Sequence, residues 1–241
     1  MKKLSVNLVA FLLLAFIGVA SRSAATPVDP ANYKKPIQVA CVGDSITQGM
    51  GASPGQDWPS QLWNLLDADK WTVKNFGLWG RTVLKKGDSP YWVQPVFKDS
   101  HDANPDVVII LLGTNDTKPQ NWAHHDEFYG DYKALIDSYK SLPSKPHIYI
   151  CLPPPGPPPG NWGINEPDLL LEIPILTKLA ADENVDLIDM HTPLLGKNLQ
   201  PDTVHPNDAG ANLLARAAFA ALTGHPAPPP PPPGIVAKPH P

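Results

Sequence analysis

Residues 107–115 read Val107-Val108-Ile109-Ile110-Leu111-Leu112-Gly113-Thr114-Asn115, six apolar residues that run directly into a polar turn. Apolar residues without alternation are typical of a central parallel strand, which is buried on both faces of its sheet. Parallel strands need crossover connections, and these are usually helices. The stretch therefore predicts an α/β fold. It also places the Gly-Thr-Asn turn at the carboxyl edge of the sheet, where ligands bind in such folds.

Further short strand-like runs alternate with helical patterns on both sides of this stretch. The five expected strands cover residues 37–42, 71–75, 107–112, 147–152 and 185–188. Regular alternation of strands and helices predicts a three-layer α/β/α domain around a five-stranded parallel sheet. A flavodoxin-like strand order, 2-1-3-4-5, is the simplest arrangement.

The helical stretches have recognisable start and stop signals. Asp57 is an expected N-cap before a helix that runs to Leu66, and Asn207 is an expected N-cap of the last helix, which stops at Gly224. Residues 126–142 carry an apolar stripe at helical spacing. A helix over residues 168–183 contains Pro174, which is expected to kink or interrupt it.

The first 25 residues have the composition of a secretory signal peptide. Two lysines precede an apolar run at residues 8–20, and small residues follow it. The run is shorter than the roughly 20 residues of a membrane-spanning helix. We therefore expect a secreted or periplasmic protein without membrane association after cleavage, which would follow residue 20, 21 or 25. An uncleaved anchor is the alternative.

The remaining chain is long enough for one α/β domain, expected at residues 35–224. Prolines at 153–159 predict a stiff loop on the rim of the site, and the proline-rich tail at 225–241 is expected to be disordered or to adopt polyproline II outside the domain. The formal net charge is −4 and no stripe of Lys or Arg is present, which argues against nucleic-acid partners.

The two cysteines are expected to be free. Cys41 and Cys151 end two strands that flank a third, so they would lie roughly 9–10 Å apart. A disulfide needs Cα atoms within about 7 Å of each other. Both thiols are therefore predicted to be buried and unpaired.

Three residue types in this chain fit acyl transfer. Asp202 precedes His205 by three residues, in a loop before the last helix, so its carboxylate can orient the imidazole. Ser45 lies on a Gly43-Asp44-Ser45 turn at the end of the first strand. Nucleophile, base and orienting acid are the three roles that a serine hydrolase needs.

Four segments together resemble the four sequence blocks of the SGNH, or GDSL, hydrolases. They are Gly43–Gly49, Asn75–Gly80, Gly113–Asp116 and Asp202–Pro206, and the resemblance covers about residues 35–222. Two shorter stretches, Leu84–Asp88 and Trp162–Asn165, are similar to bacterial members of the family described as sialate O-acetylesterases.

The resemblance implies a role for each matching residue. Ser45 would be the nucleophile, His205 the base and Asp202 the residue that orients the imidazole. An oxyanion hole would comprise the backbone N–H groups of Ser45 and Gly80 and the side-chain amide of Asn115. No cofactor and no metal ion are implied. Two carboxylates beside these residues, Asp44 and Asp116, are expected to hold loop amides.

The chain has seven tryptophans, and indole rings stack well on sugars. Two of them are expected in the core, Trp63 and Trp71, and five are expected in loops near the site, namely Trp58, Trp79, Trp92, Trp122 and Trp162. Trp79 and Trp162 are the candidate substrate-binding residues. Arg81 or Lys85 is a candidate partner for a sialate or uronate carboxylate.

The sequence thus predicts a secreted serine esterase that removes acetyl or other short acyl groups from acetylated carbohydrates, with sialate O-acetylesterase as one form. The alternatives are a lysophospholipase or broad short-chain esterase, and a non-catalytic glycan-binding module. A metal-dependent phosphoesterase would use Asp44, Asp116 and His205, but it would need more histidine ligands. The adjacent pair His124-His125 is expected to be solvated, because neighbouring histidines usually point apart.

Overall fold

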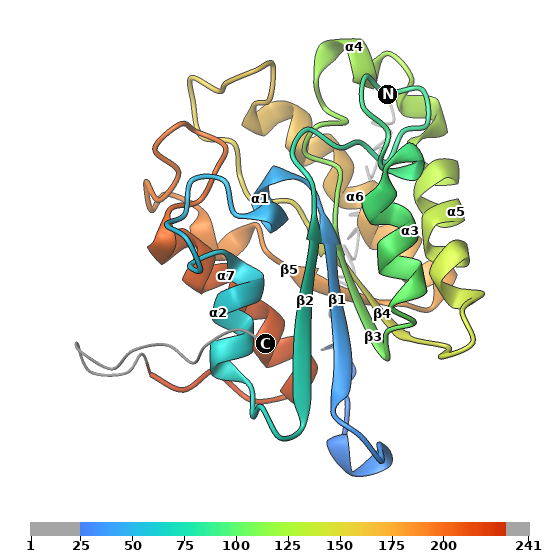
Figure 1. The fold of residues 1–241 in the computed structure, drawn as a ribbon. Helices are drawn as coiled ribbons and strands as arrows, with labels where there is room; N and C mark the ends of the chain where they lie inside the picture. The colour runs from blue at the N-terminus through green and yellow to red at the C-terminus, as the bar shows by residue number, and fades with distance from the viewer. Residues whose placement is uncertain (1–24, 230–241) are drawn as a thin grey trace, which may run out of the picture.

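The computed structural model describes residues 25–229, so most of the predicted signal peptide and the tail after residue 229 lie outside the described residues. The described part contains one sheet of five parallel strands in the order β2-β1-β3-β4-β5 (Figure 1). Their bounds are β1 Ile37–Gly43, β2 Trp71–Gly77, β3 Val107–Leu111, β4 His147–Leu152 and β5 Asp186–Asp189. The predicted flavodoxin-like order is confirmed.

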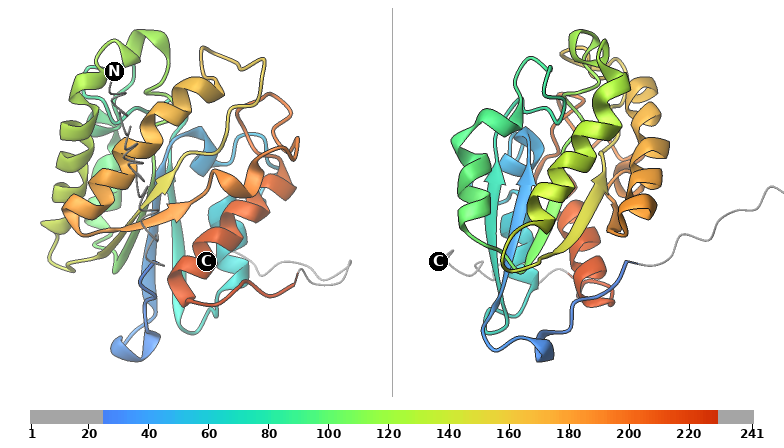
Figure 2. Two further views of the ribbon diagram at one scale, coloured as in Figure 1. Left: turned by 180° about the vertical axis from the view of Figure 1, so that it is seen from behind. Right: turned by 90° about the vertical axis from the view of Figure 1, so that its right-hand side faces the viewer.

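Helices cover both faces of the sheet and complete the three layers (Figures 1 and 2). On one face lie α2 (Trp58–Leu65) and α7 (Asp208–Thr223), and on the other lie α3 (Pro95–Asp102), α5 (Phe128–Lys140) and α6 (Glu166–Glu183). Two single-turn helices, α1 (Ser45–Gln48) and α4 (Pro119–Trp122), follow the carboxyl ends of β1 and β3. Among residues 25–229, no helix combines the length and the apolar character needed to cross a membrane.

Strand β3 is buried along its whole length, as its lack of alternation predicted. Val107, Ile109 and Leu111 pack into the core cluster beneath α2 and α7. Val108 and Ile110 pack into the second cluster, beneath α5 and α6. Successive side chains of a strand point to opposite faces, so both layers depend on this one strand.

Several boundaries differ from the sequence-based expectations. Strands β1 and β2 extend to Gly43 and Gly77, and α3 was not expected at all. Helix α6 begins earlier than predicted, because Asn165 caps it by accepting a hydrogen bond from the backbone of Asp168 at 3.2 Å. Of the kink or interruption expected at Pro174, the interruption is wrong, because α6 continues through this residue. The proline is exposed, where a carbonyl group that loses its helical partner can bond to water.

Both ends of the described chain pack against the domain. The Tyr149 hydroxyl donates to the carbonyl oxygen of Thr26 at 2.5 Å, so the folded body starts before residue 35. At the other end, Arg216 of α7 donates to the carbonyl oxygens of Ala227 and Pro228 at 2.8 and 2.7 Å. The first residues of the predicted tail therefore lie along α7.

The two cysteines are buried and free, as predicted. Cys41 is on β1 and Cys151 is on β4, with β3 between them. Burial raises the pKa of the Cys41 thiol well above its usual value. Both thiols are therefore apolar core groups.

The strand register brings three loops to one edge of the sheet. Gly43, the last residue of β1, pairs with Gly77 of β2 and Leu111 of β3. The segments that follow these strands carry Ser45, Gly80 and Asn115. Aligned strand ends explain why residues so far apart in the sequence meet at this edge.

Candidate functional site

Ser45 is the first residue of α1, and the preceding residue, Asp44, caps this short helix. The Asp44 carboxylate accepts a hydrogen bond from the Ile46 N–H at 2.9 Å, which shapes the turn. Strand β2 ends directly against α1: a Cβ at Gly77 would lie 2.2 Å from the backbone nitrogen of Gln48. Glycine is therefore required there, and the close packing holds Ser45 at the strand end.

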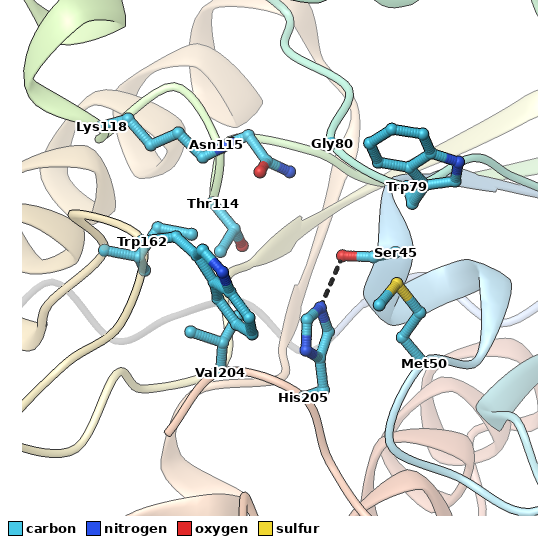
Figure 3. Close-up of a pocket in the computed structure, with 11 residues that line it drawn as sticks. Ser45, Met50, Trp79, Gly80, Thr114, Asn115, Lys118, Trp162, Val204 and His205 are labelled. Carbon is cyan, nitrogen blue, oxygen red and sulfur yellow. Dashed lines mark hydrogen bonds between the residues drawn. The ribbon is translucent and has the colours of Figure 1, made fainter. Parts of the chain in front are cut away.

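Folding brings Ser45 into contact with His205, which lies 160 residues further along the chain. The Nε2 atom of His205 lies 2.8 Å from the Ser45 hydroxyl oxygen (Figure 3). On the other side of the ring, Nδ1 lies 2.7 Å from Oδ2 of Asp202. An ionised carboxylate can only accept, so Nδ1 carries the proton and Nε2 is free to accept from the serine.

The loop of Asp202 keeps its carboxylate ionised. Oδ1 accepts hydrogen bonds from the backbone N–H groups of Val204 at 3.0 Å and His205 at 2.7 Å. Burial raises the pKa of Asp202, but the hydrogen bonds from His205 and Val204 and the charge of His205 together hold it below its usual value. The acid and the imidazole thus form one rigid unit on a single short loop.

A cavity of about 250 Å³ opens beside Ser45 (Figure 3). Gly80 and Asn115 line it together with Ser45 and His205. Gly80 has φ +76°, and no atom lies within 4 Å of the Cβ that another residue would carry. The amide of Asn115 is almost fully buried and extends from its loop into the cavity. All the predicted oxyanion donors therefore border the same space.

Two exposed indoles flank this cavity, Trp79 with 59% and Trp162 with 53% of its surface exposed. The Trp162 ring lies 5.3 Å from the His205 ring, measured between centroids. Trp79 is held by its backbone N–H, which donates to the Gln48 side chain at 2.8 Å. Both candidate substrate-binding residues therefore stand at the mouth of the site. The remaining residues around the cavity are Met50, Thr114, Lys118, Ile164 and Val204.

The other three tryptophans expected near the site do not line the cavity. Trp58 is fully buried, and its indole N–H contacts the Thr47 hydroxyl at 3.3 Å. Trp92 donates to the Val83 carbonyl at 2.7 Å, and Trp122 packs against the Phe128 ring. Trp58 begins α2, Trp92 lies in the middle of the helical turn Tyr91–Val93, and Trp122 ends α4. Trp63 and Trp71 are in the core, as predicted.

The two candidate cations for a substrate carboxylate are already occupied. Lys85 forms an ion pair with Asp131 at 3.2 Å and lies over the Trp92 ring. The Nε–H of Arg81 donates to the Trp79 carbonyl at 2.8 Å, and its guanidinium lies 5.5 Å from the Trp79 ring centroid. Neither residue lines the cavity. Arg81 instead supports the position of Trp79.

Gln200, a residue not expected at the site, connects two of its loops. Its side-chain nitrogen donates to the Pro155 carbonyl at 2.6 Å and to the Val204 carbonyl at 3.0 Å. It thereby ties the proline-rich loop that leads to Trp162 to the loop of His205. Residues 153–156 are buried, although the whole segment 153–159 was expected on the rim. A lone glutamine in a loop has no sequence signal that would reveal such a bridge.

Three carboxyl groups are fully buried behind the site, those of Asp44, Asp116 and Glu172. Asp116 accepts from the N–H groups of Val83 at 3.1 Å and Leu84 at 2.7 Å, so it holds loop amides as predicted. Burial raises its pKa to about 8. Both carboxyl oxygens of Glu172 lack a hydrogen-bond partner. Within the described part of the chain, no three His, Cys, Asp or Glu residues are arranged to hold a metal ion.

The chain is similar to known esterases and acylhydrolases. Residues 41–213 match the model of the GDSL-like lipase/acylhydrolase family. An acetylxylan esterase of Xylanibacter ruminicola is 37% identical over 215 residues, which is 80% of this chain. The match covers 44% of that relative, so the chain spans less than half the length of the curated protein.

Solved structures show the same fold. The crystal structure of an acetyl xylan esterase is 26% identical, covers 77% of this chain and 99% of its own, and has a TM-score of 0.62. An inhibitor-bound aryl esterase of M. smegmatis has a TM-score of 0.65 at 22% identity, over 76% of this chain and 96% of its own. Since the family match covers well over half of its residues, the chain belongs to the GDSL-like lipase/acylhydrolase family.

Proposed function

We propose that this protein is a secreted carbohydrate O-acetylesterase that works through an acyl-enzyme on Ser45. One observation carries the proposal: the continuous contact from the Ser45 hydroxyl through the His205 imidazole to the Asp202 carboxylate, over 2.8 and 2.7 Å. A neutral imidazole with its Nδ1 proton held by a carboxylate is the base that a serine nucleophile requires.

The chemistry follows from these contacts. The Ser45 oxygen attacks the acetyl carbonyl carbon while Nε2 of His205 takes its proton. The carbonyl oxygen becomes an oxyanion, bound by the backbone N–H groups of Ser45 and Gly80 and by the Asn115 amide. When the intermediate collapses, the C–O bond to the sugar breaks and His205 protonates the leaving oxygen. Water, activated by the same imidazole, then releases acetate from the serine.

The rim and the volume of the site support a small acyl group on a carbohydrate. Two exposed indoles beside the nucleophile suit the flat apolar faces of sugar rings. A cavity of about 250 Å³ has room for a short acyl group and part of a sugar. Because a curated relative and a solved structure are acetylxylan esterases, acetylated xylan is the first substrate to test. Acetylated sialic acid is the second, because of the likeness of Leu84–Asp88 and Trp162–Asn165.

The test is acetate release from acetylated xylan, acetylated sialic acid and acetylated monosaccharides, with Ser45→Ala as the blank. We expect the variant to lose at least about a thousandfold in kcat, as when a serine nucleophile is removed. Equal rates for the two proteins would contradict the proposal. A series of p-nitrophenyl esters should peak at acetyl, and a peak at eight carbons or longer would favour a lipid substrate instead.

The glycan-binding alternative predicts a different result. A non-catalytic module would bind acetylated polymers without reacting with a fluorophosphonate, which labels only an activated serine. We expect labelling at Ser45, blocked in Ser45→Ala and in His205→Ala.

A further inference from the structure

Asp44 contacts one member of the proposed oxyanion hole, Asn115, and also caps the turn that carries another, Ser45. One carboxylate oxygen accepts from the Ile46 N–H at 2.9 Å, beside the Ser45 turn. The other accepts from the side-chain nitrogen of Asn115 at 3.1 Å, a contact across 71 residues of sequence. Asp44 itself is completely buried and does not line the cavity, so it cannot touch a substrate.

The contact determines which way round the Asn115 amide faces. A primary amide has a nitrogen with two donor hydrogens and an oxygen that only accepts. A carboxylate also only accepts, so only the amide nitrogen can face Asp44. One hydrogen is then used by Asp44, and the second remains on the same nitrogen, at the wall of the cavity (Figure 3). With the amide reversed, the Asn115 oxygen would face the developing oxyanion and repel it.

We infer that Asp44 is a positioning residue for the oxyanion hole: its carboxylate orients the Asn115 amide so that an N–H faces the reacting carbonyl oxygen. This inference rests on the proposed esterase function. It assigns to Asp44 an effect on kcat that does not depend on binding of the sugar, because preorganised donors act on charge that appears only in the transition state.

The charges around Asp44 allow this role at neutral pH. Burial raises the pKa of Asp44 to about 6, against the lowering effects of the Ile46 N–H, of His205 and Lys118, and of the Asn115 amide. The charge of Asp44 in turn raises the pKa of two other buried carboxyls, those of Asp116 and Glu172. Asp44 is therefore ionised at pH 8, where the test should be made.

Asp44→Asn separates the two contacts. Asparagine is as good an N-cap as aspartate, so its oxygen can still accept from the Ile46 N–H. The NH₂ group of the new asparagine then faces Asn115. The Asn115 amide must therefore reverse, so that its oxygen takes the place of its nitrogen. We expect kcat to fall about 10²–10³-fold, as for loss of one oxyanion donor, with KM within about threefold. A kcat within about twofold of wild type would overturn the inference.

A double-mutant cycle tests whether Asp44 acts through Asn115. Asn115→Ala should lower kcat to a similar extent. The double variant, Asp44→Asn with Asn115→Ala, should have a kcat no lower than that of Asn115→Ala alone. If the two losses multiply, Asp44 acts elsewhere and the inference is wrong. If Asp44→Asn does not fold, Asp44→Ser takes its place, because serine also caps a helix but is too short to reach Asn115.

Asp57→Asn is the matched control. Asp57 caps α2 by accepting from the Ser60 N–H at 2.9 Å, and it also accepts from an asparagine side chain, that of Asn75, at 3.2 Å. The Asp57 side chain does not line the cavity. The same Asp-to-Asn substitution at this position should therefore leave kcat unchanged within about twofold. Ser45→Ala is run beside these variants. If wild type and Ser45→Ala are equally inactive, the proposed function is wrong. If wild type is active and Asp44→Asn is equally active, only the role inferred for Asp44 is wrong.

Discussion

Trp162 is a single side chain that we propose binds substrate without taking part in the chemistry. It has φ +51°, an uncommon conformation for a bulky residue, and its neighbour Asn161 anchors this turn. The Asn161 side chain accepts from the Trp162 N–H at 2.9 Å and donates to the Asp202 carbonyl at 3.3 Å. The indole is thereby held over the imidazole while more than half of it stays exposed.

Trp162→Ala should weaken binding of the polymer more than it slows chemistry. Loss of a stacking surface is expected to raise KM for acetylated xylan about tenfold. The kcat for p-nitrophenyl acetate, which is too small to need the platform, should change less than about threefold. Trp162→Phe should restore most of the affinity. Equal losses on both substrates would show that the indole supports His205 instead.

At the scale of elements, the loop from β4 to α6 is held as one unit with the loop of His205. The imidazole of His191, at the end of β5, contacts the Pro153 carbonyl at 2.9 Å and the Glu166 carboxylate at 3.0 Å. Gln200 adds its two bonds to Pro155 and Val204. Proline content at 153–159 predicted stiffness, but the anchoring comes from side chains that no local pattern could connect.

Gln200→Leu should loosen this unit. Leucine leaves the buried Pro155 and Val204 carbonyls without a donor, which is expected to cost about 1–3 kcal/mol for each group. Thermal unfolding should therefore occur several degrees lower, and KM for the polymer should rise. Gln120→Leu is the control, because Gln120 is exposed and bonds only to Asp88 in the described part of the chain. Unchanged melting of Gln200→Leu would show that the loops hold together without the bridge.

At the scale of the whole molecule, the buried carboxyl group of Glu172 is expected to make folding stability depend on pH. It is fully buried on α6, and its oxygens have no hydrogen-bond partner. Burial, together with the charges of Asp116 and Asp44, raises its pKa well above the usual value. A raised carboxyl pKa favours the folded state at low pH. That contribution is lost progressively once the pH exceeds the pKa of the Glu172 carboxyl in the unfolded chain, near 4.5.

Glu172→Gln removes this ionisation and keeps the shape of the side chain. The free energy of unfolding of the variant, relative to wild type, should therefore increase between pH 5 and pH 8. We expect a difference at pH 8 on the order of 1–3 kcal/mol, measured by urea denaturation. A difference that stays constant with pH would mean that Glu172 has the same proton occupancy in both states.

The fold and the residue types of the site follow from local signals. An unbroken apolar run marks β3, and glycine-rich or polar turns after three strands place Ser45, Gly80 and Asn115 at one edge. Element ends were less predictable, because capping by Asn165 and tolerance of Pro174 depend on neighbours and on solvent exposure.

Amino-acid order alone thus determined the α/β class, the strand order and the candidate chemical groups, because these depend on spacing within short segments. Only the tertiary structure decided which indoles border the cavity, that Gln200 joins two loops, and that Asp44 faces Asn115. Those contacts span 71 residues in one case and 45 in another. Their existence depends on how the layers pack, which brings together side chains that carry no mutual signal along the chain.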